Sequence, residues 1–246
     1  MRLMVFSDIH GNLEALQSVL SDAANRNVHR SIFLGDMVGY GPYPNECIEL
    51  VRGLKNCRCL AGNHDLAALW DTSPYGMSSA AKEAILWTMD QLSTENKEYL
   101  GSLPDRLDLA DMVFVHANPY NPRGWRYVMD RKYALRSFAA TSCRHLFIGH
   151  SHRPLVITRK HLFAVDLQAA AGSIKIEVND TRRRIINCGS IGQPRDRDAR
   201  SCYLIFDSRK QVLEFYRVKY DTEKTAKAIQ AAGLPSSLSK RLLKGI

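Results

Sequence analysis

Short apolar runs alternate with amphipathic segments along the first third of the chain. Apolar runs at residues 3–6, 31–34 and 58–61 predict three strands. Between the first two, Asn12 precedes a segment that predicts a capped helix, and a second helix is expected after Pro44. The apolar residues at helical spacing in the first helix are Leu13, Leu16, Val19, Leu20 and Ala23. Strands and helices in this order indicate parallel strands joined by helices.

The middle of the chain is predicted to be mostly helical before strands resume. Residues 66–103 are rich in Ala, Leu, Met and Trp with helix-like periodicity, and they end at a Leu-Pro turn, so we expect a helical insertion there. Strands are expected at residues 112–115 and 145–148, with a helix over about 131–140 between them.

After residue 153 the pattern changes to a period of two, which is typical of strands. The alternating segments are 155–157, 162–165, 174–178, 184–186, 202–206 and 212–218. One or two peripheral helices are expected from residue 221. Both halves fit one domain over residues 1–246, of the α/β class and in part α+β, in which two mixed sheets pack face to face with helices on the outer surfaces.

Composition narrows the class of protein. A chain of 246 residues with 45% hydrophobic content can bury a sizeable core. It has no apolar run of membrane-spanning length and no signal-peptide pattern, so we expect a cytoplasmic protein without a membrane partner. The six cysteines are irregularly spaced and are interpreted as reduced thiols, with core packing favoured over a metal or redox site for Cys57 and Cys59.

The net charge of +9 favours an anionic partner. A small phosphorylated or nucleotide substrate is the first expectation, and nucleic acid is a second. No sequence feature indicates how many copies of the chain associate.

Side chains that can bind metals follow the predicted strands. They are Asp8, His10, Asp36, Asn63, His64, His116, His150 and His152. Any one of them alone is more often a capping or hydrogen-bonded polar residue. In the sequence they form five groups, each just after a predicted strand: Asp8 with His10, Asp36, Asn63 with His64, His116, and His150 with His152. Since the ends of strands on one edge of a sheet converge, the five groups together predict a shared site.

The ligand types indicate which metals this site would bind. Carboxylate and amide oxygens with imidazole nitrogens, and no thiolate, suit divalent Mn, Fe, Zn, Co or Ni. Two such ions bridged by one carboxylate would polarise a phosphoryl oxygen and produce a bridging hydroxide near neutral pH. An imidazole has a suitable pKa to protonate the leaving oxygen.

The motifs D-x-H, G-D, G-N-H-[DE], H and G-H-x-H occur in this order over about residues 3–152. The chain therefore resembles the calcineurin-like metallophosphoesterase superfamily. The resemblance implies a four-layer αββα sandwich with two metal ions. It assigns Asp8, His10 and His152 to one ion and Asn63, His116 and His150 to the other. It makes Asp36 the bridging ligand and His64 the general acid.

Gly39 and Tyr40 depart from the Ser/Thr protein phosphatases of that superfamily, which have Asp and Arg at these two positions. Residues 35–42 and 187–195 are instead similar to small bacterial and archaeal phosphodiesterase-like members. We therefore expect hydrolysis of a phosphodiester or a nucleotide phosphoanhydride. A phosphomonoesterase or phosphoprotein phosphatase is the alternative, and a non-catalytic nucleic-acid-binding module is a third hypothesis.

Arg195 and Tyr40 are candidate substrate-binding residues. Arg195 follows a predicted strand in a loop with Gly and Pro, where its guanidinium could bind phosphate in place of the missing Arg. The alternative is a surface salt bridge with Asp196 or Asp198. Several aromatic residues could stack on a base, although core packing is the commoner role. They are Tyr40, Tyr43, Trp125 and Tyr127.

Overall fold

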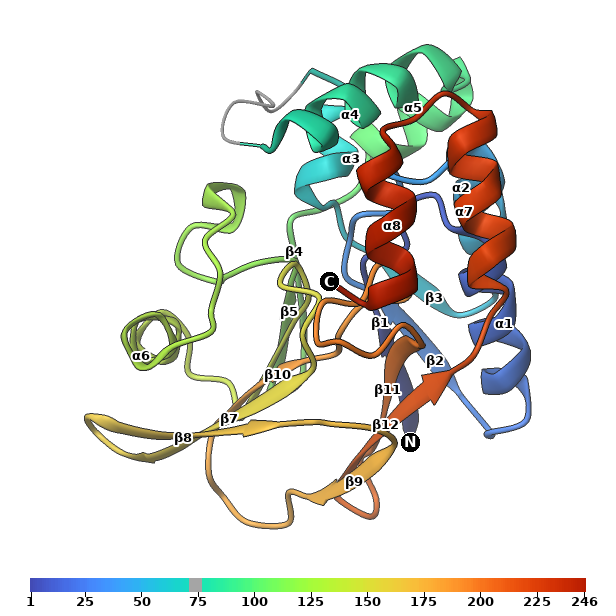
Figure 1. Ribbon diagram of the computed structural model, residues 1–246. Helices are drawn as coiled ribbons and strands as arrows, with labels where there is room; N and C mark the ends of the chain where they lie inside the picture. The colour runs from blue at the N-terminus through green and yellow to red at the C-terminus, as the bar shows by residue number, and fades with distance from the viewer. Residues whose placement is uncertain (71–76) are drawn as a thin grey trace.

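Two six-stranded sheets form the centre of the computed structural model, which describes residues 1–70 and 77–246 (Figure 1). The first sheet contains, in spatial order, β3 (Cys57–Cys59), β2 (Arg30–Phe33), β1 (Arg2–Phe6), β11 (Ser201–Asp207), β12 (Val212–Val218) and β9 (Ile174–Glu177). The second contains β4 (Arg106–Leu109), β5 (Met112–Val115), β6 (His145–Ile148), β10 (Arg184–Asn187), β7 (Leu155–His161) and β8 (Ala164–Ala169). Parallel and antiparallel pairs occur in both, so both sheets are mixed as predicted.

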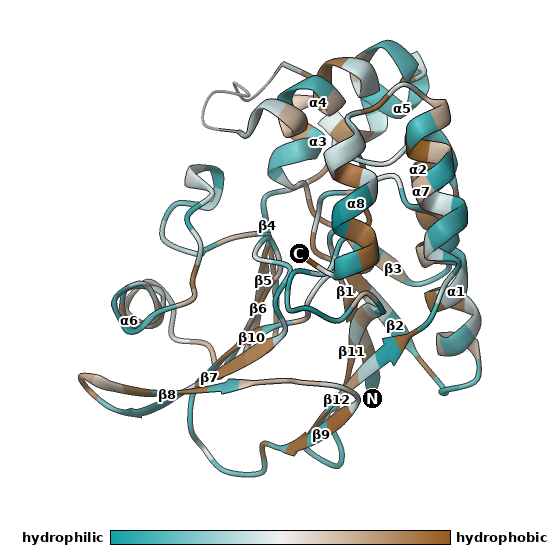
Figure 2. Cartoon of the chain, in the orientation of Figure 1, coloured by the Kyte–Doolittle hydropathy of each residue, from teal (hydrophilic) through white to brown (hydrophobic). Residues whose placement is uncertain are grey.

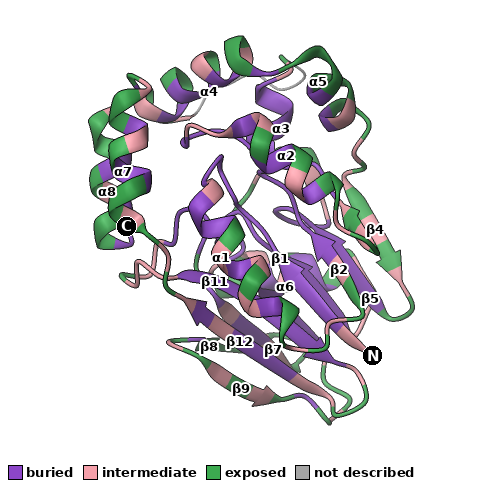
Figure 3. Cartoon of the chain, turned by 90° about the vertical axis from the view of Figure 1, so that its right-hand side faces the viewer, coloured by how far each residue is buried: buried purple, intermediate pink, exposed green. Residues whose placement is uncertain are grey.

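The central strands of both sheets are mostly apolar, as expected when both of their faces are covered. In β1, Leu3 and Val5 belong to the cluster between the two sheets. Met4 and Phe6 alternate with them and belong to the cluster under the helices. Figure 3 shows this strand buried in the interior of the molecule.

Helices complete the four layers. The helices α1 (Leu13–Ala24) and α2 (Pro44–Arg52) pack on the first sheet, and α6 (Arg131–Ala139) packs on the second. The chain therefore has the αββα sandwich that the sequence predicted. Surface helices such as α7 (Thr222–Ala231) carry both hydrophilic and hydrophobic residues, as Figure 2 shows. Among the described helices, none combines the length and apolarity needed to cross a membrane.

Helices from distant parts of the chain meet above one edge of the sheets. Residues 63–101 contain α3 (Asn63–Ala67), α4 (Ser79–Gln91) and α5 (Thr94–Gly101), while residues 71–76 of the expected insertion lie outside the described residues. The C-terminal helix α8 (Ser236–Lys244) shares a buried cluster with α4 and with Tyr40. This packing brings the end of the chain close to the loops that follow β1 and β2.

Some predicted elements are wrong in detail. The strand expected at 162–165 is β8, shifted to Ala164–Ala169, because Leu162 and Phe163 form an exposed turn between β7 and β8. The strand expected at 58–61 ends at Cys59, and β4 was not predicted. Cys57 and Cys59 are free thiols that pack against the core as expected.

Candidate metal centre

The side chains that the sequence singled out converge at one edge of the two sheets. Asp8 and His10 follow β1, Asp36 follows β2, Asn63 and His64 begin α3, His116 follows β5, and His150 and His152 follow β6. All eight are buried. Backbone hydrogen bonds join their loops, since the N–H of Asp8 donates to Gly35 and that of His10 donates to Asp36, both at 3.0 Å.

The backbone of these loops is strained where the side chains turn inward. A positive φ occurs at Asp8 (57°), His10 (52°), Asp36 (62°), Tyr40 (64°), His150 (62°) and His152 (58°). Residues with a side chain seldom adopt this conformation, which costs about 1 kcal/mol or more at each position. The concentration of such residues at one place is typical of a functional site.

Asp8 and Asp36 each use one carboxylate oxygen to hold the fold and turn the other toward the centre. Asp8 Oδ2 accepts from the N–H of His150 at 3.0 Å, and Asp36 Oδ1 accepts from the N–H of His64 at 2.8 Å. Asp8 Oδ1 and Asp36 Oδ2 are buried without a hydrogen-bond partner among the described residues. Asp36 Oδ2 lies 3.6 Å from His10 Nε2 and 3.3 Å from His116 Nε2, so it sits between two groups of ligands.

Backbone carbonyl groups fix the protonation of the histidine rings. Nδ1 of His10, His116 and His152 lies 3.0, 3.0 and 2.6 Å from the carbonyl oxygens of Val38, Leu34 and Gln193. A carbonyl only accepts, so Nδ1 carries the proton and the lone pair of Nε2 faces the centre. In His150 the roles are reversed, because Nε2 donates to the carbonyl of Trp125 at 2.8 Å.

With these tautomers, acceptor atoms face one another inside the protein. His10 Nε2 and His152 Nε2 are 3.1 Å apart, and His116 Nε2 lies 3.2 Å from Asn63 Oδ1. Buried acceptors in such contact are unfavourable unless a cation lies among them. Three sets have ligand atoms within 4.8 Å of one another: Asp8, His10 and His152; His10, Asp36 and His64; and Asp36, His116 and His150. The unpartnered oxygens and nitrogens therefore fit divalent metal ions.

Burial keeps most of these rings neutral, as metal binding requires. It lowers the pKa of His10 and His152, and it lowers the pKa of His150 to about 3 with a further contribution from His116. Burial acts in the same direction on His116, but the carboxylates of Asp36, Asp8 and Asp65 together outweigh it and raise the pKa of His116 to about 9, so its Nε2 binds a proton when no metal ion takes that place. The strong effect of Asp36 shows that the centre attracts positive charge.

His64 lies beside this cluster without a partner for Nδ1 among the described residues. Burial lowers its pKa to about 4, although Asp36 acts to raise it. Its ring packs against the backbone of Gly39, where a Cβ atom would lie 2.5 Å from Nδ1. The site thus has no room for an acid-orienting Asp at this position.

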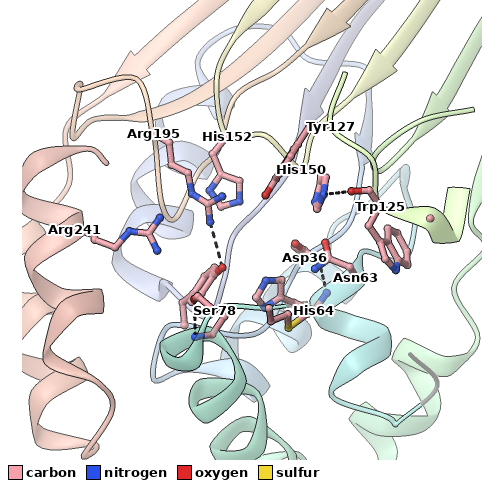
Figure 4. A pocket seen from close by; sticks show the side chains of 14 residues that line it. Asp36, Asn63, His64, Ser78, Trp125, Tyr127, His150, His152, Arg195 and Arg241 are labelled. Atoms are coloured by element: carbon pink, nitrogen blue, oxygen red, sulfur yellow. Dashed lines mark hydrogen bonds between the residues drawn. The ribbon is translucent and has the colours of Figure 1, made fainter. Parts of the chain in front are cut away.

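A cavity of about 470 Å³ opens onto the cluster, and Arg195 is one of its walls (Figure 4). Arg195 Nη2 lies 3.2 Å from the Tyr40 hydroxyl and 3.2 Å from Gln193 Oε1. Asp196 and Asp198 pair with other arginines, so the alternative of a surface salt bridge for Arg195 is wrong.

The candidate aromatic residues have different positions. Tyr40 is buried between the histidines and Arg195, with its ring 4.5 Å from the rings of both His10 and His64. Tyr127 stacks on His150 at 4.4 Å and is 45% exposed. Trp125 lines the cavity, whereas Tyr43 packs against the helical core and does not line it.

Two residues at the site were missed by the sequence analysis. The carboxylate of Asp65 accepts hydrogen bonds from the N–H groups of Gly62, Asp36, Met37 and Val38 at 2.8 to 3.2 Å. Arg241, on α8, lines the cavity opposite the metal-binding loops. The position of Asp65 in the G-N-H-D motif was a signal for its importance, but no sequence signal pointed to Arg241.

An αββα sandwich with buried carboxylate and imidazole ligands at its sheet edge defines the class of metal-dependent phosphoesterases. The chain belongs to the calcineurin-like phosphoesterase superfamily, whose domain model matches residues 1–211. The resemblance drawn from the motifs is thus confirmed, and the protein is a hydrolase of phosphoric esters.

Similar proteins cover the whole chain. An uncharacterised protein of Methanocaldococcus jannaschii is 39% identical over 247 residues, which cover 99% of this chain and 98% of that protein. The crystal structure of a metallophosphoesterase from Sphaerobacter thermophilus is 40% identical, with 100% of both chains covered and a TM-score of 0.90. A hypothetical protein from Pyrococcus horikoshii is 22% identical and has the same fold, with 100% of this chain and 98% of that chain covered and a TM-score of 0.81.

Proposed function

We propose that the protein hydrolyses a phosphodiester or a nucleotide phosphoanhydride with two divalent ions of the Mn, Fe, Zn, Co or Ni type. One ligand set would be Asp8, His10 and His152, and the other Asn63, His116 and His150, with Asp36 shared. The observation that supports this most is the position of the free Asp36 oxygen, between His10 and His116 at 3.6 and 3.3 Å.

Cations bound there would polarise a phosphoryl oxygen and make a water molecule a stronger nucleophile. The residues of the chain supply orientation. The carbonyl groups of Val38, Leu34 and Gln193 hold three imidazole rings in the tautomer that binds metal. The backbone N–H groups of His64 and His150 hold the two carboxylates.

His64 is the proposed proton donor to the leaving oxygen. Without substrate its ring is neutral, because burial lowers its pKa to about 4. A bound phosphate group would add negative charge beside the ring and shift the pKa upward, toward the range that a general acid needs. The unpartnered Nδ1 leaves the ring free to respond in this way.

Arg195 and Tyr40 are the proposed substrate contacts. The Arg195 guanidinium lies in the cavity without a carboxylate partner among the described residues, so it can bind a phosphate oxygen. The cavity of about 470 Å³ is larger than one phosphate group, and its walls include both Arg195 and Tyr127. This room favours a substrate with substituents on both sides of the phosphorus over a small monoester.

Hydrolysis of bis-p-nitrophenyl phosphate by metal-reconstituted protein tests the proposal. The wild type should be active with Mn²⁺. His64→Ala should lose about 10²- to 10⁴-fold in kcat with its metal content retained. Asp36→Asn should lose activity and also bind fewer than two metal ions per chain by elemental analysis.

Exposed residues of the same type provide controls. His161→Ala and Asp108→Asn should retain activity and metal content, since both positions lie outside the cluster. Inactivity of the wild type toward diesters with all five metals would contradict the proposal. Faster hydrolysis of p-nitrophenyl phosphate or a phosphopeptide would favour the phosphomonoesterase alternative.

A further inference from the structure

Arg241, on the C-terminal helix α8, brings a second guanidinium into the cavity beside Arg195 (Figure 4). The position of α8 is fixed by Leu238 and Leu242, which are buried in a cluster that includes Tyr40. Leu238 lies one helical turn before Arg241, so the face that packs on Tyr40 also directs Arg241 toward the cavity. The guanidinium is therefore placed there by packing.

No Asp or Glu side chain among the described residues pairs with either guanidinium. In the part of the chain that the structure describes, no ion pair joins Arg195 or Arg241 to an Asp or Glu, because Asp196 and Asp198 pair with other arginines. Among the described residues, Nε of Arg195 is buried without a hydrogen-bond partner, whereas Nε of Arg241 donates to the main-chain oxygen of Ile246, the last residue of the printed sequence, at 2.8 Å. Two neighbouring, partly buried guanidinium groups without an Asp or Glu partner leave positive charge that a bound anion would offset.

The two arginines lie at different distances from the reaction centre. Tyr40 stands beside both, with its ring centroid 5.9 Å from Cζ of Arg195 and 6.0 Å from Cζ of Arg241. The backbone N–H of Arg195 donates to the carbonyl oxygen of His152 at 3.2 Å, so Arg195 lies next to the centre. Burial and then the charge of Arg195 lower the pKa of Arg241, which is consistent with two neighbouring guanidinium groups. Arg241 thus lies farther than Arg195 from the metal-binding side chains, as Figure 4 shows.

We propose that Arg241 and Arg195 form an anion subsite that binds a second phosphoryl group, linked directly to the one that is hydrolysed. The inference rests on the proposed function and selects the nucleotide phosphoanhydride as the substrate class. Arg195 lies next to both the histidines and Arg241. A phosphoryl group bound at the histidines and another bound at Arg241 would therefore be neighbours. Such spacing fits a P–O–P linkage better than a nucleic-acid backbone, in which a sugar separates the phosphates.

Other walls of the cavity fit the same substrate. The first turn of α4 reaches the cavity through Ser78 and Ala81, and the positive end of a helix attracts anions. Tyr127 offers an exposed ring at the rim, on which a base can stack. A nucleotide with two linked phosphoryl groups would use the aromatic and the basic walls together.

Binding of two non-hydrolysed nucleotides tests the subsite without any turnover. Calorimetry on metal-loaded protein would compare AMP with α,β-methylene-ADP, which differs from it by one linked phosphoryl group. The wild type should bind the diphosphate analogue about tenfold or more tightly, as expected for a charge-assisted contact. Arg241→Ala should bring the ratio of the two affinities close to one, and Arg241→Lys should restore part of it.

Lys240→Ala is the matched control, because it removes the same charge from the exposed side of α8. It should keep the preference for the diphosphate analogue. Equal binding of both nucleotides by the wild type would overturn the subsite, as would a preference that survives Arg241→Ala. If Lys240→Ala also loses the preference for the diphosphate analogue, the preference comes from long-range charge, and this result would also overturn the subsite. Circular dichroism and melting temperature would show that each variant is folded.

The outcome is separate from that of the hydrolysis experiment. If bis-p-nitrophenyl phosphate is cleaved and the nucleotide preference is absent, the subsite fails and the hydrolytic function stands. If the preference is present and no diester is cleaved with any metal, the subsite stands as a binding site and the hydrolytic proposal fails.

Discussion

Gly39 shows how a single residue determines the surroundings of the proposed acid. Its φ is +84°, and a Cβ atom would lie 2.5 Å from His64 Nδ1. The sequence showed only that the Asp of the protein phosphatases is missing at this position. The structure adds the physical reason, which is that the His64 ring occupies the space that a side chain would need.

We predict that Gly39→Ala displaces His64 and reduces kcat by about 10²-fold or more, with the metal content unchanged. The matched control is Gly172→Ala, since Gly172 also has a positive φ, of +72°, but has open space where a Cβ would be. Both variants should lose about 1 kcal/mol of stability from backbone strain, and only Gly39→Ala should lose activity. Steady-state kinetics and elemental analysis would check this, and full activity of Gly39→Ala would contradict it.

Residue types and strand ends were enough to bring the metal-capable residues together, because parallel strands deliver the residues that follow them to one edge. Of the two arginines that line the cavity, Arg195 and Arg241, only Arg195 was predicted. Arg195 follows a strand, so its loop could be placed near the centre. The helical pattern around Arg241 shows which face of α8 is apolar, but it does not show which other element that face will contact.

At the scale of elements, Asp65 joins the loop after β2 to the beginning of α3. Its oxygens accept from the N–H groups of Asp36, Met37, Val38 and Gly62. These groups face away from any other acceptor at the end of β2 and the start of α3, so the carboxylate satisfies them. One side chain thereby fixes where the shared Asp36 stands relative to His64.

We predict that Asp65→Asn lowers the free energy of unfolding by about 3 kcal/mol. The amide group has one acceptor oxygen, so at least one buried N–H loses its partner and the charge that strengthens the bonds is gone. Burial and then the charge of Asp36 raise the pKa of Asp65 to about 7, so urea unfolding is best measured at pH 8. Asp108→Asn, at an exposed salt bridge, should change stability by less than about 0.5 kcal/mol. Equal losses in the two variants would argue against the anchoring role.

The elements themselves were predictable where one physical signal dominated. The helix α1 begins after Asn12, whose side chain accepts from the N–H of Ala15 as a cap. The predicted position of β8 was wrong because Leu162 and Phe163, two apolar residues in the turn between β7 and β8, resemble part of a buried strand. They are exposed by 62% and 65%, and apolar pattern alone cannot distinguish a turn that protrudes from a strand that packs.

At the scale of the whole molecule, the net charge of +9 does not form a basic surface at residues 182–184. Arg182 and Arg184 both pair with Asp180, and Arg183 donates to backbone carbonyl groups. Their charges are therefore used within the fold. The partly buried charge of Arg195 and Arg241, in contrast, faces a cavity and is available to a ligand.

The stability of the whole molecule should depend on pH through His145, at the start of β6. Both ring nitrogens are buried without a hydrogen-bond partner among the described residues, and the ring packs edge-on against Phe206 at 5.3 Å. Burial, and then the charge of Arg144, lowers the pKa of His145 to about 4 from the ordinary 6.5. Between these two values the unfolded chain binds a proton that the folded protein does not bind. The free energy of unfolding therefore falls as the pH falls through this range.

We predict that His145→Phe removes this dependence. Relative to the variant, the wild type should lose up to about 3 kcal/mol between pH 6.5 and pH 4, and the difference should be constant above about pH 7. Urea unfolding of both proteins in the presence of a chelator would measure it, because other buried histidines then contribute equally to both and cancel. A difference that does not change with pH would show that the folded protein accommodates a charged ring at this position, through water or movement of the neighbouring Arg144.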